Sequence, residues 1–162
     1  MKRSILIIPI AILALAVVAV AAVAHSGASK ATSAGYATSS AATISTASHG
    51  LGTMLVDAKG RTVYLWKADT GHKSTCSGAC ATAWPPVTTG GKPKAHGAAK
   101  ASLLGTTKRS DGSTQVTYAG HPLYRFKGDT KVGQHNGQGS DAFGADWLVV
   151  APGGKAITRG AS

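Results

Sequence analysis

The sequence predicts a mainly β fold: a single domain of antiparallel hairpins formed by two tandem repeats, with a short helical turn near the cysteines. Three observations lead to this prediction. The chain repeats itself at an offset of sixty residues, each copy holds two strand-like segments around a glycine turn, and the chain contains no Glu and few long helical patterns. Together they favour paired strands over helices.

The repeat is clearest between residues 52–70 and 112–130, which align without a gap. Both copies contain the pattern Y-x-[FWY]-x-x-D, as YLWKAD beginning at Tyr64 and YRFKGD beginning at Tyr124. Trp84 and Trp147 then open the related segments WPPV and WLVV. Such a repeat usually encodes one supersecondary unit that is used twice.

The N-terminal segment predicts export. Lys2 and Arg3 precede an uncharged, apolar run over residues 5–24, which ends in the small residues AVA. This is the pattern of a secretory signal peptide over residues 1–24, with cleavage before His25. The alternative is a retained N-terminal anchor, because about 20 apolar residues can also span a bilayer. In both cases the rest of the chain is exported, either extracellular or associated with the cell envelope.

Residues 25–48 are expected to form a flexible linker. They are almost entirely Ala, Ser, Thr and Gly, a composition that buries too little apolar surface to offset the conformational entropy of the chain. The following residues, 49–162, are long enough to bury about two-thirds of the surface that their unfolded form exposes. We expect them to form one secreted-repeat β domain.

A hairpin is expected in each repeat. Segments 53–58 and 61–67 flank Lys59 and Gly60, and segments 114–118 and 121–127 flank Ala119 and Gly120. Glycine at the second loop position permits the positive φ that a tight hairpin turn needs. These positions therefore predict the two turns.

The outgoing strand of each hairpin carries aromatic residues on one face. Side chains alternate along a strand, so Tyr64 and Trp66 point to the same side, as do Tyr124 and Phe126. The opposite face is apolar in the first copy but carries Arg125 in the second. We therefore expect the aromatic face to build the core that the repeats share.

Between the hairpins, CSGACATAW is expected to form one or two helical turns, which Pro85 and Pro86 would end. Residues 90–101 and 128–146 are expected to be surface loops, because they are rich in glycine and lack periodicity. The segment DWLVV is expected to be a strand, followed by a turn and a short last segment.

The paired Y-x-[FWY]-x-x-D segments, CSGACATAWPPV and DGSTQVTYAGHPLYRFKGD together resemble the bacterial secreted-repeat family, described as predicted lipoproteins with a Yx(FWY)xxD motif. The similarity covers about residues 50–150. It implies export, a tandem repeat and an envelope location, but no established reaction or ligand. The sequence departs from a lipoprotein because no cysteine precedes Cys76, so nothing marks a lipid attachment point.

Two roles are open for the motif residues Tyr64, Trp66, Asp69, Tyr124, Phe126 and Asp129. In the structural role, which we favour, the rings fill the core and each Asp fixes a turn just past its strand by accepting backbone N–H groups. In the alternative role, both tyrosines and both aspartates line a ligand groove with pseudo-twofold symmetry. The spacing alone does not require such a groove.

Cys76 and Cys80 are the only cysteines. In an oxidising compartment such a pair is expected to form a disulfide. The alternative is a copper or zinc site, because His72, Cys76 and Cys80 would share one face if the segment were helical. His121 and His135 are possible distant ligands.

Known catalytic motifs are missing from the sequence. There is no GxSxG elbow and no HExxH, and GQGSDAFG lacks a glycine that a phosphate-binding loop would need.

The chain carries 17 Lys and Arg against 6 Asp, a net charge of +11. An exported cation of this size is expected to be drawn to anionic cell-wall polymer or to a membrane surface, whereas nucleic acid is an implausible partner outside the cell.

The sequence therefore predicts a non-catalytic, cell-envelope binding or structural module that is not an enzyme and needs no cofactor. The first alternative is an extracytoplasmic metal-binding or electron-transfer protein that uses Cys76 and Cys80. The second, ranked last, is an uncharacterised hydrolase.

Overall fold

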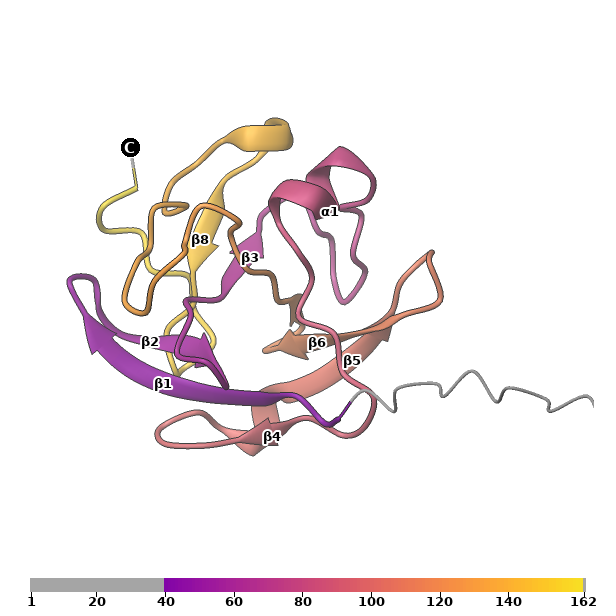
Figure 1. Cartoon of the computed structure of the whole chain (residues 1–162), viewed down its shortest axis with the longest axis horizontal. Coiled ribbons are helices and arrows are strands. Elements are labelled where there is room, and N and C mark those ends of the chain that lie inside the picture. The colour runs from indigo at the N-terminus through magenta and orange to yellow at the C-terminus, as the bar shows by residue number, and fades with distance from the viewer. Residues whose placement is uncertain (1–39, 162) are drawn as a thin grey trace, which may run out of the picture. The chain divides into compact units, whose positions relative to one another are not determined.

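The computed structural model describes residues 40–161 (Figure 1). The expected signal peptide or anchor and most of the expected linker lie outside these residues. The elements in chain order are β1 (Thr43–His49), β2 (Gly52–Asp57), β3 (Tyr64–Trp66), α1 (Ala79–Ala83), β4 (Lys94–Ala95), η1 (Ala101–Leu103), β5 (Leu104–Lys108), β6 (Thr114–Tyr118), β7 (His121–Pro122), η2 (Ala142–Gly144) and β8 (Trp147–Val149).

The fold-class prediction is confirmed. Within residues 40–161 the strands form three small sheets with the orders β2-β1-β4, β3-β8 and β5-β6-β7, and every strand pairing there is antiparallel except that of β1 with β4. The one α-helix among the described residues is the short α1, which follows Cys76, contains Cys80 and ends at Ala83, before Trp84 and the two prolines. No helix within residues 40–161 has the length and apolar character needed to cross a bilayer.

Both expected hairpin turns form at the predicted glycines. In the first, the Asp57 N–H donates to the Arg61 carbonyl at 2.8 Å, and Gly60 has φ 75°. In the second, Ala119 and Gly120 both have positive φ, 49° and 88°, as a two-residue type I′ turn requires. Glycine is favoured at both places because this backbone region is costly for residues with a Cβ.

The linker boundary drawn after residue 48 is too late, because β1 already begins at Thr43. This strand pairs with β2 from Ile44 opposite Asp57 to His49 opposite Gly52, and its other edge pairs with β4. The Ser- and Thr-rich composition hides the strand, since main-chain bonds on two sides hold it and only Ile44 is fully buried. The expectation that residues 90–101 are purely loop is likewise wrong at β4, which adds to this sheet.

The expectation that the aromatic face alone builds the core is also incomplete, because β3 is buried on both faces. The first core contains the motif rings together with Trp84 and Trp147. The second core, on the opposite face, contains Val63, Leu65 and Leu123. A strand with apolar residues on both sides lies between two cores, and the three-residue β3 does so.

The two repeats are interlocked. Strand β3 of the first repeat pairs with β8 at the end of the second, from Tyr64 opposite Val149 to Trp66 opposite Trp147. In the matching place, residues 124–127 of the second repeat run beside residues 83–86 of the first, with the Arg125 N–H donating to the Pro85 carbonyl at 2.9 Å. Figure 1 shows β3 and β8 side by side.

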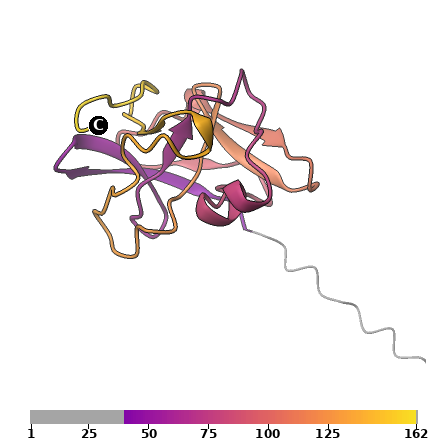
Figure 2. The same cartoon turned by 90° about the horizontal axis from the view of Figure 1, so that it is seen from above.

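The contact between the repeats has local twofold character at the two motif tyrosines. The Tyr64 N–H donates to the Tyr124 carbonyl at 2.8 Å, and the Tyr124 N–H donates to the Tyr64 carbonyl at 2.9 Å. Helix α1 lies apart from the C-terminal segment in both views (Figures 1 and 2).

Candidate functional site

The motif residues meet as two crossed tyrosine–aspartate pairs. The Tyr64 hydroxyl donates to Oδ2 of Asp129, and the Tyr124 hydroxyl donates to Oδ2 of Asp69, each at 2.5 Å. In each pair the tyrosine comes from one repeat and the aspartate from the other. Both tyrosines are fully buried and both aspartates are 5% exposed.

The second oxygen of each aspartate holds the loop that follows it. Oδ1 of Asp69 accepts the N–H and the hydroxyl of Thr75, both at 2.8 Å. Oδ1 of Asp129 accepts the Asn136 N–H, also at 2.8 Å. Each carboxylate therefore joins its own loop to the tyrosine of the other repeat.

The aromatic residues form a column across the same contact. Trp84 and Trp147 stack at its centre with ring centroids 3.9 Å apart. Trp66 stacks on the outer side of Trp147 at 5.0 Å, and Phe126 lies on the outer side of Trp84 at 4.4 Å. Each outer ring again packs on a tryptophan of the other repeat. Of the four motif rings, only Phe126 is partly exposed.

Each motif tyrosine closes the column from the side with an edge-on contact. Tyr64 meets Trp84 with ring centroids 5.3 Å apart, and Tyr124 meets Trp147 at 5.1 Å. Burial raises the pKa of the Tyr64 hydroxyl well above its ordinary value, and the hydrogen bond to Asp129 adds to this. Burial and Asp69 act in the same way on the pKa of Tyr124. Both hydroxyls therefore stay protonated, as donors to a carboxylate must.

In this geometry the polar groups of the motif residues are buried and form hydrogen bonds inside the protein. The tyrosine hydroxyls and the carboxylates satisfy one another, and the rings fill the first core. An open groove would need these groups on a solvent-facing wall. The arrangement favours the structural role of Tyr64, Asp69, Tyr124 and Asp129 over the ligand groove.

The two pairs differ in what surrounds them. The Tyr64 oxygen receives one further contact, from the Gly137 N–H at 3.4 Å. The Tyr124 oxygen lies 2.7 Å from Oγ of Ser74, which accepts a hydrogen bond from Nη1 of Arg109 at 2.6 Å. Since Tyr124 donates its hydroxyl hydrogen to Asp69, the Ser74 hydroxyl is the donor to the Tyr124 oxygen.

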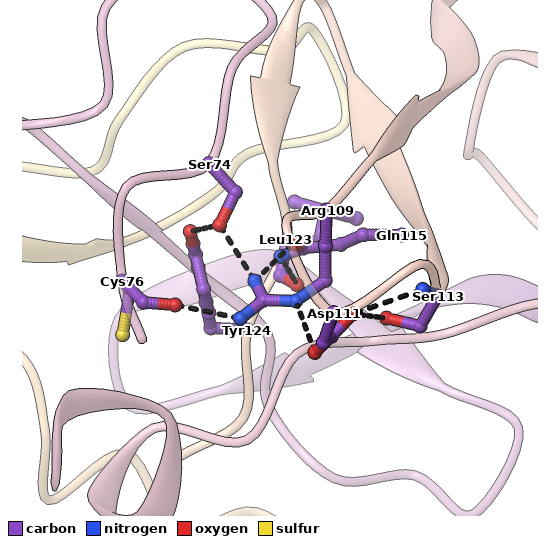
Figure 3. A network of polar contacts seen from close by, with 8 residues as sticks. All are labelled: Ser74, Cys76, Arg109, Asp111, Ser113, Gln115, Leu123 and Tyr124. Carbon is purple, nitrogen blue, oxygen red and sulfur yellow. Dashed lines mark hydrogen bonds and ion pairs between the residues drawn. The ribbon is translucent and has the colours of Figure 1, made fainter. Parts of the chain in front are cut away.

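Arg109 is the centre of a buried polar network (Figure 3). Its side chain is only 3% exposed, and its Nη2 donates to the Cys76 carbonyl at 2.6 Å while Nη1 also donates to Oε1 of Gln115 at 2.7 Å. Nε pairs with Asp111 at 3.3 Å. Sequence reasoning missed Arg109, because an arginine beside a turn reads as a surface residue and no spacing marks it as buried.

The predicted disulfide between Cys76 and Cys80 is present, with Cα atoms 5.3 Å apart. The metal alternative needed two free thiolates and one continuous helix. The sulfurs are bonded to each other, and α1 begins only at Ala79, so His72 shares no helical face with them. The His72 ring lies instead against the hairpin turn, where a Cβ on Gly120 would come within 3.1 Å of it.

His121 and His135, the two possible distant ligands, lie in other parts of the fold. His121 is in β7, and the His135 ring lies near Gly50. Within residues 40–161 no three His, Cys, Asp or Glu side chains gather in a way that could hold a metal ion.

Comparison with known proteins matches the architecture. A family model described as a secreted repeat of unknown function matches residues 45–88 and again residues 105–151, which together are more than half of the chain. The two matches begin sixty residues apart, as the internal repeat does. Neither the curated proteins nor the solved structures gave a match. The chain therefore belongs to the family of secreted repeats of unknown function, and the resemblance inferred from the motifs is confirmed.

Proposed function

We propose that this protein is a non-catalytic module of the cell envelope that binds anionic polymer through its basic surface. Its family is described as secreted, which supports export. The motif residues, which would be the first candidates for catalysis, are buried against one another. This leaves the surface of the domain as the place where a partner would bind.

The unequal burial of charges is the observation that carries the proposal. Of the 17 Lys and Arg, Lys2, Arg3 and Lys30 lie outside the described residues, and of the remaining 14 only Arg109 is buried, which leaves 13. Of the 6 Asp, three are buried, namely Asp57, Asp69 and Asp129, which leaves three. The accessible surface thus carries far more cationic than anionic side chains, and it attracts polyanions at low ionic strength.

The manner of attachment to the envelope belongs to the same proposal. Residues 1–24 either leave as a signal peptide or stay as an anchor, and residues preceding Thr43 then link that end to the domain. Cleavage before His25 would free the protein from the membrane, and binding to the polymer would then be all that keeps it in the envelope. Retention of residues 1–24 would tether the same surface near the membrane.

The test uses the exported protein, purified from an oxidising compartment and applied to isolated anionic wall polymer. The proposal expects retention at low salt and release as the ionic strength rises, because exposed ion pairs are screened. A neutral polysaccharide matrix serves as the control. Absent retention, or retention that does not change with salt, would contradict the proposal.

A further inference from the structure

A buried carboxylate, Asp57, organises two arginines at the surface. The Asp57 side chain is 4% exposed, and its Oδ1 accepts the N–H groups of Lys59 and Arg61 at 2.8 and 3.0 Å. Its Oδ2 accepts Nε and Nη2 of Arg61 at 3.2 and 3.0 Å, and Nε of Arg125 at 2.7 Å. Five N–H groups therefore fix this carboxylate and hold both guanidinium groups in place.

Asp57 stays ionised in this position. Burial opposes its charge, but the Arg61 N–H, the Arg125 guanidinium and the Lys59 N–H together hold the pKa of the carboxyl below its usual value. The residues around the hollow described below carry three positive charges, on Lys59, Arg61 and Arg125, and one negative charge, on Asp57, an excess of two positive charges. The cluster is oriented by Asp57 without being neutralised by it.

Both guanidinium groups keep free donors. Arg125, whose side chain is 26% exposed, donates only its Nε to the described residues, so the N–H groups of both its Nη atoms are unused there. The Arg61 side chain is 36% exposed, and its Nη1 donates no hydrogen bond to the described residues. An oriented guanidinium with free N–H groups matches the oxygens of a phosphate or carboxylate group.

These groups line a hollow of about 350 Å³. Its wall also includes residues 40–43, the exposed Thr88 and the buried Val87. The Thr88 hydroxyl has no hydrogen-bond partner among residues 40–161 and adds a neutral donor. A second hollow of about 460 Å³, beside β5, has Lys92 as its sole charged lining residue and holds no comparable cluster.

The internal repeat shows that the pairing of Asp57 with Arg125 has no counterpart on the other side of the domain. At an offset of sixty, Asp57 corresponds to Thr117 and Arg125 corresponds to Leu65. The first repeat thus has an apolar residue at the position equivalent to Arg125, and the second repeat has an uncharged residue at the position equivalent to Asp57. Since such an ion pair is weak evidence for stability, its presence on one side only points to binding.

We propose that the hollow between Asp57, Arg61 and Arg125 binds a phosphate group of an anionic envelope polymer. This rests on the proposed function and assigns it a site. Phosphate suits the hollow because donors on several side chains can meet several oxygens at once. A polymer fits better than a bilayer, because the large apolar side chains that residues 40–161 expose, Val132 and Phe143, lie outside the lining of the hollow.

Binding of inorganic phosphate and of a glycerol phosphate oligomer, measured by calorimetry at low salt, tests the site. Arg125→Lys keeps the charge but loses the planar fork, and we expect it to weaken binding about tenfold. Lys155→Gln removes a whole positive charge from an exposed residue outside the lining of the hollow, yet it should leave the dissociation constant within about twofold. Equal affinity of Arg125→Lys and the unaltered protein would overturn the site.

Mapping of amide signals by NMR in the unaltered protein keeps the test valid if a variant folds poorly. Phosphate should shift signals of residues 40–43, 59–61, 88 and 125, and shifts confined to other residues would overturn the site. Binding to phosphatidylglycerol vesicles but not to the oligomer would overturn the choice of polymer. If Arg125→Lys leaves the salt-sensitive retention on wall polymer unchanged, this site is rejected but the proposed function is not. If the unaltered protein is not retained at all, the proposed function itself is rejected.

Discussion

The two crossed tyrosine–aspartate pairs carry the same motif in different surroundings. Around Tyr64 and Asp129 the hydroxyl has one further neighbour, a main-chain N–H at 3.4 Å. Around Tyr124 and Asp69 the hydroxyl belongs to a network that passes through Ser74 to Arg109 and the disulfide turn. The shared part is therefore the junction between the repeats, and the network is an addition on one side.

This comparison explains why one short domain contains the pattern twice. A single repeat would leave its tyrosine hydroxyl without a carboxylate and its outer ring without a tryptophan to pack on. The second copy supplies both, and receives the same from the first. The motif encodes a reciprocal joint, so each copy depends on the other.

The largest effect is expected when a ring at the junction is removed. Tyr64→Ala and Tyr124→Ala should each lower the free energy of unfolding by about 3 to 5 kcal/mol, because each removes a fully buried ring from the first core. Chemical denaturation measures this. A variant as stable as the unaltered protein would show that the junction is not the core, and Val132→Ala, at a residue 63% exposed, is the matched control.

The next effect separates the two sides. Arg109→Met should cost about 3 kcal/mol, because it leaves the Cys76 carbonyl and the Gln115 side chain buried without their donor. Amide hydrogen exchange should then show faster opening in residues 69–76 than in the matching loop, residues 129–136. Equal acceleration of both loops would contradict the one-sided network.

Alkaline pH should weaken both sides. Because the pKa of each folded tyrosine lies above the ordinary value of 10.0, the unfolded chain releases these protons first as the pH rises. The contribution of the two tyrosines to the free energy of unfolding is fully present below about pH 10. It falls above that pH, by about 1.4 kcal/mol per tyrosine at pH 11. Denaturation midpoints measured from pH 8 to 11 test this, and Tyr64→Phe or Tyr124→Phe should each flatten the decline.

The smallest effect is a difference between the two hydroxyls. Tyr124→Phe removes the bond to Asp69 and the 2.7 Å bond from Ser74, whereas Tyr64→Phe removes the bond to Asp129 and only a 3.4 Å contact from the Gly137 N–H. Tyr124→Phe should therefore be the more destabilising change, by about 1 kcal/mol. Denaturation of the two variants under identical conditions gives the difference, and the reverse order would contradict the hydrogen-bond count.

Local features of the fold could be predicted from the sequence. The turns at Gly60 and Gly120 follow from the glycine that a positive φ favours, and the disulfide follows from two cysteines in an exported chain. The short helix before Pro85 follows from the proline that ends it. Each of these depends on neighbouring residues alone.

The features that could not be predicted depend on partners distant in the chain. Equal motifs at Tyr64 and Tyr124 do not say which copy's aspartate each hydroxyl meets. The strand at Thr43 has too little apolar surface to be recognised before its neighbours are known. Burial of Arg109 depends on acceptors in two separate segments, Ser74 and Cys76 in one loop and Gln115 in β6. In each case the deciding contact joins residues that no local pattern connects.

The most direct test of the crossed joint is a pair of double-mutant cycles on the free energy of unfolding. One cycle combines Tyr64→Phe with Asp129→Asn, across the repeats, and the other combines Tyr64→Phe with Asp69→Asn, within one repeat. The crossed joint predicts a coupling energy of about 1 to 3 kcal/mol in the first cycle and about zero in the second. Coupling within the repeat, with none across it, would contradict the reciprocal arrangement.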